Sequence, residues 1–154
     1  MREVTKIILH CSASDDPKQT AAMIDQWHKA RGFAKIGYHY FIRFDGTIER
    51  GRGLEEIGAH AEGYNKDSVG ICLAGLKFFT TAQFDSLSRV LGRLKYLYPK
   101  ATVHGHCEFS NKSCPVFDYS RFKKEYEWTG TNSLLKTFLK LCKLLLHLLG
   151  RLKS

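Results

Sequence analysis

The chain has 154 residues, of which 44% are hydrophobic and 25% charged. This composition is typical of one globular domain and excludes a disordered or fibrous protein. The five cysteines are an odd number at irregular spacing, which favours free thiols in a reducing compartment over a disulfide framework. All 15 acidic residues lie before Trp128, whereas five of the 24 lysines and arginines follow it. We therefore expect a mildly basic domain over residues 1–128 and a separate basic tail.

The first half of the chain predicts a strand, a helix and a hairpin. Val4 to Leu9 is a short apolar run that indicates a buried strand with His10 at its end. A helix is expected from a Thr20 cap to Arg31, with Gly32 as its stop signal. Residues 38–49 predict a hairpin, because the Asp-Gly pair within them supplies the positive φ angle of a tight turn.

The second half predicts two further strands and two helices. Residues 68–74 form an apolar strand pattern, and Thr81 opens a helical pattern that Pro99 ends. Val103 and His104 lie at the expected end of another strand, and residues 119–128 indicate a short helix. This alternation predicts an α/β fold, a single domain with a central mixed sheet flanked by helices.

Potential metal ligands gather in two distant segments. His10 follows the first strand, and the segment His104–Pro115 contains two histidines and two cysteines. Two imidazoles and one thiolate from these segments can meet on one zinc ion, and a site with three protein ligands keeps a position for water. The His106–Cys114 spacing matches no standard zinc-finger interval. The residues alone therefore indicate a possible metal site and leave its exact ligands open.

Several short motifs occur in order between about residues 4 and 128. They are ILHCSA at 8–13, QWHK at 26–29, GYHYFI at 37–42, DGTIE at 45–49, GAHAEGYN at 58–65, SVGICL at 68–73 and KSCPVFD at 112–118. Together they resemble the zinc-dependent N-acetylmuramoyl-L-alanine amidases of the type 2 family, particularly its compact phage-lysozyme-like branch.

The resemblance implies a set of ligands and catalytic residues. His10, His106 and Cys114 are expected to bind Zn²⁺, with Tyr38 and Lys112 as the catalytic side chains. His104 and Cys107 remain alternative ligands, because Cys107 stands where relatives tend to have a second histidine. The same resemblance makes His60 and Asn65 candidate substrate contacts.

The function that the resemblance implies is hydrolysis of the amide bond between N-acetylmuramic acid and L-alanine in peptidoglycan, most naturally by a phage or prophage endolysin. The alternative is a noncatalytic peptidoglycan-recognition module, whose members share the fold but typically lack the cysteine ligand. We expect a monomer that is made in the host cytoplasm without a signal peptide and acts at the cell wall. Nucleic-acid binding is not expected, because the chain has neither a recognised motif nor an aromatic stacking platform.

The tail has a composition of its own. Residues 129–133 form a linker, and residues 134–154 are rich in leucine and basic residues with no acidic residue. The basic residues lie on one stripe of a helix: Lys136, Lys140, Lys143, His147 and Arg151. A helix docked on the domain and a membrane-spanning helix are the alternatives, but a charge in every turn disfavours spanning. We expect an interfacial amphipathic helix that contacts anionic membranes or envelope polymers.

Overall fold

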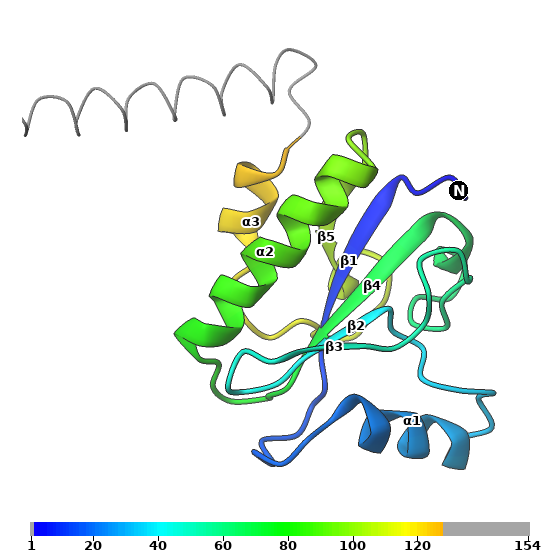
Figure 1. Ribbon diagram of the computed structural model, residues 1–154, viewed down its shortest axis with the longest axis vertical. Coiled ribbons are helices and arrows are strands. Elements are labelled where there is room, and N and C mark those ends of the chain that lie inside the picture. The colour runs from blue at the N-terminus through cyan, green and yellow to red at the C-terminus, as the bar shows by residue number, and fades with distance from the viewer. Residues whose placement is uncertain (1, 128–154) are drawn as a thin grey trace, which may run out of the picture.

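The computed structural model describes residues 2–127. The predicted linker and amphipathic helix at 129–154 lie outside the described residues and stay predictions. The elements in chain order are β1 (Lys6–Cys11), α1 (Ala21–Ala30), β2 (Tyr40–Ile42), β3 (Ile48–Arg50), η1 (Asn65–Asp67), β4 (Ser68–Leu73), α2 (Thr81–Leu97), β5 (Thr102–Gly105), η2 (His106–Glu108) and α3 (Ser120–Glu125). This arrangement confirms the predicted α/β domain with a mixed sheet (Figure 1).

Five strands form one sheet in the order β3-β2-β4-β1-β5. The neighbours β2 and β4, β4 and β1, and β1 and β5 pair in parallel, and only β3 at the edge is antiparallel. The register sets His10 opposite Cys72 on β4, and Leu9 opposite Gly105 on β5. The carboxyl ends of β1, β4 and β5 therefore meet at one edge, where ligand sites of such sheets usually form.

Helices cover both faces of the sheet, with α2 and α3 on one side and α1 on the other (Figure 1). The α2 side holds the larger apolar cluster, in which Leu9 and Ile71 pack with Leu87 and Leu91 of α2. The α1 side has a smaller cluster that includes Ile24, Phe41 and Cys72. Alternation along β1 and β4 assigns successive side chains to opposite faces, so that the His10 side chain faces α1.

The helix boundaries follow their capping residues. Thr20 caps α1 by accepting from the Met23 N–H, and Gly32 has a φ of 86° just beyond the last turn. For α2 the cap is Thr80, one residue before the predicted start, in a capping box with Gln83. The two short 3₁₀ turns, η1 and η2, were not predicted because three residues carry no periodic pattern.

Two further findings concern the described part of the chain. Its four cysteines, Cys11, Cys72, Cys107 and Cys114, are free thiols, as expected from the odd number and irregular spacing of the cysteines in the sequence. Among the helices of residues 2–127, none has the length and apolar character needed to cross a membrane.

Candidate metal centre and its cleft

Three side chains converge at the carboxyl edge of the sheet. Ligand atoms of His10, His106 and Cys114 all lie within 4.8 Å of one another. His10 is the penultimate residue of β1, and His106 directly follows β5. Because β1 and β5 are parallel neighbours, residues far apart in the sequence reach the same point. This trio is the set that the resemblance implied.

Backbone hydrogen bonds hold the loop that carries Cys114. The Cys107 N–H donates to the Cys114 carbonyl at 2.5 Å, and the Cys114 N–H donates to the Lys112 carbonyl at 2.9 Å. The Cys11 N–H also donates to the Cys114 sulfur at 3.5 Å. The thiol group is thereby fixed against the end of β1.

The two imidazoles are neutral at pH 7, as metal ligands must be. Burial, followed by the nearby His60, His106 and Lys112, holds the pKa of His10 well below its usual value. Burial and Lys112 also lower the pKa of His106. The contact between the two thiols lowers the pKa of Cys11 to about 6, and the same contact, followed by burial, raises the pKa of Cys114.

His60 supports His10 from behind. Its Nδ1 lies 3.1 Å from His10 Nε2, while the other nitrogen of His10, Nδ1, lies 3.8 Å from the Cys114 sulfur. A Cβ on either Gly58 or Gly70 would come within 2.5 Å of the His60 ring, so both glycines are needed to make room for it. One nitrogen of His10 thus faces the candidate metal position while the other is held by His60.

Asn65 acts on the loop rather than in the cleft. Its side-chain oxygen accepts from the backbone N–H groups of His60 and Ala61, at 2.8 and 2.9 Å. His60 lines the cleft, whereas Asn65 does not. Contact with the substrate remains a prediction for both His60 and Asn65. In the structure, His60 also contacts His10, and Asn65 also binds the backbone of the loop.

The two alternative ligands have other partners. His104 Nε2 lies 2.7 Å from the Thr102 hydroxyl, and His104 Nδ1 lies 2.9 Å from a Glu108 carboxylate oxygen. The Cys107 sulfur lies 3.5 Å from the Tyr119 hydroxyl and is exposed. Neither residue belongs to the three-residue cluster.

Tyr38 stands beside the cluster on the α1 side of the sheet. Its ring centroid lies 5.0 Å from that of His10 and 5.3 Å from that of His28. Burial, followed by the neighbouring thiols of Cys72 and Cys114, raises its pKa well above 10. The phenol therefore keeps its proton and is suited to donate a hydrogen bond or a proton.

The cluster lies in a cleft of about 350 Å³. Its rim combines apolar side chains with cations, namely Trp27, Arg31, Phe33, Leu76 and Lys112. Sequence reasoning identified only Lys112 among them, through the family motif. The others were missed because each arrives from α1 or a loop whose position depends on the tertiary fold.

His28 and His39 each accept a hydrogen bond from a backbone N–H group. The Gly37 N–H donates to His28 Nδ1 at 2.8 Å, and the Gly70 N–H donates to His39 Nδ1 at 3.0 Å. Each ring thus satisfies a buried backbone donor next to the site.

Comparisons with known proteins agree on one family. The model of the N-acetylmuramoyl-L-alanine amidase family matches residues 1–117. The endolysin of Escherichia phage T7 is 42% identical over 131 residues, which cover 79% of this chain and 86% of the relative. The peptidoglycan-recognition protein LB of Drosophila melanogaster is 33% identical over 112 residues, covering 68% of this chain and 48% of that protein.

A solved structure supports the same conclusion. The amidase LysC from Clostridium intestinale matches with a TM-score of 0.75 and 32% identity, covering 80% of this chain and 85% of that one. The fold is therefore shared over most of the chain.

Proposed function

The chain belongs to the N-acetylmuramoyl-L-alanine amidase family, and we propose that it is a phage-type endolysin that uses zinc to hydrolyse the amide bond between N-acetylmuramic acid and L-alanine in peptidoglycan. The observation that carries this proposal is the convergence of His10, His106 and Cys114 in the lining of one cleft. The proposed endolysin acts at the bacterial cell wall.

The donor set fits zinc. Two neutral imidazoles and one thiolate are typical zinc ligands, and catalytic zinc sites have three protein ligands. Zinc bound by these residues would lower the pKa of a water toward ~7 and so supply a nucleophile at neutral pH. The contact with His60 supports this assignment, because the nitrogen of a ligating histidine that faces away from the metal usually has such a partner.

Lys112 and Tyr38 are proposed to act on the reacting amide. Lys112 lines the cleft and lies near enough to His10 and His106 to lower their pKa values. Its ammonium group can stabilise the negative charge that develops on the amide oxygen. The Tyr38 phenol keeps its proton at neutral pH and can donate it to the departing amine nitrogen while it takes up the proton that the attacking water loses.

The alternative is a noncatalytic peptidoglycan-recognition module; the similarity to a peptidoglycan-recognition protein of Drosophila supports the same polymer as the ligand. Both functions use the same cleft for the same polymer. The two functions differ in whether the amide bond is cut. Release of cleavage products from peptidoglycan therefore distinguishes them.

The proposed envelope contact concerns residues 134–154. Their basic, acid-free composition is that of an interfacial helix that binds anionic lipids. If deletion of residues 132–154 left binding to anionic liposomes unchanged, this part of the proposal would be wrong.

The decisive experiment is release of soluble fragments from purified peptidoglycan, analysed by mass spectrometry. The wild type should release stem peptides that begin with L-alanine. Zinc-stripped protein and Cys114→Ser should release none, and added zinc should restore only the former. Cys107→Ser is the matched control, because its thiol is exposed and outside the cluster.

Other products would contradict the proposal in distinct ways. Glycan fragments would place the cleaved bond in the sugar chain. Binding without any cleavage would establish the recognition module. Loss of activity in Cys107→Ser but not in Cys114→Ser would show that Cys107, rather than Cys114, is the zinc ligand.

A further inference from the structure

The cleft above the candidate metal centre carries positive charge without a compensating carboxylate. Arg31 and Lys112 both line it, and no aspartate or glutamate is among its lining residues, all of which belong to the described part of the chain. Such a cleft favours anionic ligands over neutral ones.

The two cations serve different parts of the cleft. Lys112 acts electrostatically on His10 and His106, the ligands from β1 and the β5 end. Arg31 acts instead on His28 and Tyr38, on the α1 side. Lys112 precedes the candidate ligand Cys114 by two residues and so lies toward the reacting bond, whereas Arg31 is the C-cap residue of α1 and lies toward that helix.

Arg31 differs from the other cations of its own segment. Lys29 pairs with Asp25 at 2.7 Å, and Lys35 pairs with Glu56. Arg31, between them in sequence, forms no ion pair with any residue of the described range 2–127. A guanidinium that faces a cleft without a carboxylate partner is available to a ligand.

The side chain is nonetheless held in place. Arg31 Nε donates to the Trp27 carbonyl at 3.3 Å, and the guanidinium carbon lies 5.7 Å from the centroid of the Phe33 ring. The terminal nitrogens remain free of hydrogen bonds to described residues. Arginine presents such nitrogens in a planar fork that matches a carboxylate.

Apolar side chains surround this position. Trp27, Phe33 and Leu76 line the cleft, and 40%, 38% and 39% of their surfaces are exposed. A ligand that covers them would displace water from the rim. An ion pair formed there is strengthened because the local dielectric constant falls.

We propose that Arg31 is a specificity-determining residue that binds a free carboxylate of the peptidoglycan stem peptide, the α-carboxylate of the γ-linked residue that follows L-alanine. This inference rests on the proposed function and adds the substrate class: stems with that carboxylate free are preferred over stems in which it is a carboxamide. The carboxylate supplies the partner that Arg31 lacks within the described chain.

The test uses two synthetic muramoyl peptides that differ only in this group, carboxylate or carboxamide. The wild type should show a kcat/KM about 10- to 100-fold higher for the carboxylate, as expected for one charged hydrogen-bonded pair. Arg31→Gln should reduce this ratio to about one, mainly through a higher KM for the carboxylate substrate. Arg31→Lys should keep part of the preference, since the charge remains but the fork is lost.

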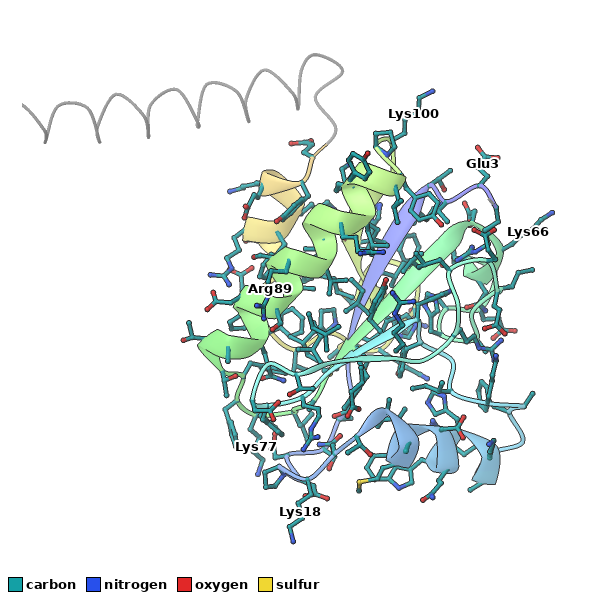
Figure 2. All side chains as sticks on the ribbon, viewed as in Figure 1. Glu3, Lys18, Lys66, Lys77, Arg89 and Lys100 are labelled. Atoms are coloured by element: carbon teal, nitrogen blue, oxygen red, sulfur yellow. The ribbon has the colours of Figure 1, made fainter. Side chains whose placement is uncertain are left out.

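The control is Arg89→Gln, an exposed arginine of α2 on the opposite side of the sheet (Figure 2). It should retain the wild-type ratio, and the zinc content of all variants should match the wild type. A wild type that cleaves both substrates equally, or an Arg31→Gln protein that keeps the preference, would overturn the role of Arg31 while leaving the amidase proposal intact. A wild type that cleaves neither substrate would instead overturn the amidase proposal, and the inference with it.

Discussion

The two faces of the same sheet have opposite characters. On the α2 face, β1 and β4 contribute Leu9, Ile71 and Leu73 to an apolar core. On the α1 face, the same strands carry His10 and make room for His60, and His28 and His39 are also buried there. Alternation along a strand lets one face supply stability while the next residue supplies chemistry. The apolar face offsets the cost of burying three imidazoles, and of partly burying that of His60, on the other.

The largest effect on stability is expected on the α2 face. Leu91 of α2 is fully buried in the apolar cluster. Leu91→Ala should lower the free energy of unfolding by about 2–5 kcal/mol, because it removes apolar contacts and leaves a cavity. Urea unfolding measures this change, and the zinc content of the folded protein should stay the same. Arg93→Ala on the same helix is the control and should change stability by less than about 0.5 kcal/mol.

The largest effect on turnover is expected on the opposite side. Lys112 is exposed at the rim, so that Lys112→Met should leave folding and zinc binding intact. It should lower kcat by about 10²–10³-fold, the usual cost of removing one group that stabilises an oxyanion. Lys100→Met, at an exposed position remote from the cleft (Figure 2), should retain wild-type turnover. A normal kcat in Lys112→Met would remove this lysine from the mechanism.

A smaller effect, on zinc affinity rather than on folding, is expected when His60 is replaced. His60→Gln removes the imidazole that lies against His10 and should weaken zinc affinity about 10- to 100-fold, as for other partners of ligating histidines. Competition with a chelating dye measures this affinity. His104→Gln is the matched control, because His104 pairs with Thr102 and Glu108 instead. Equal zinc affinities in the two variants would show that His60 does not position His10.

The sequence predicts the α2 face more fully than the α1 face. Apolar periodicity located β1, β4 and α2, and capping signals placed both ends of α1. The family motifs predicted His10, His106 and Cys114 as ligands, which periodicity could not do, and the fold brings these three residues together. Neither pattern reveals that His60 contacts His10 or that Arg31 faces the cleft. Those facts depend on the packing of the loop that precedes β4 and of the end of α1, which involves glycines and long-range contacts.

The last expected difference between the two faces concerns the loss of stability at low pH. Burial lowers the pKa of His39 to about 4, below the value near 6.5 of an unfolded chain. Its stabilising contribution is therefore complete above pH 6.5 and is lost as the pH falls toward 4, because the unfolded state then binds the extra proton. The expected loss is about 2 kcal/mol between pH 7 and pH 5, measured by urea unfolding at both pH values with zinc removed. In His39→Gln this part of the pH dependence should vanish, whereas Leu91→Ala should keep the wild-type slope, since no histidine among residues 2–127 is buried on its face of the sheet. If the free energy of unfolding of His39→Gln depended on pH as in the wild type, other histidines of the α1 face would be the cause of the acid sensitivity.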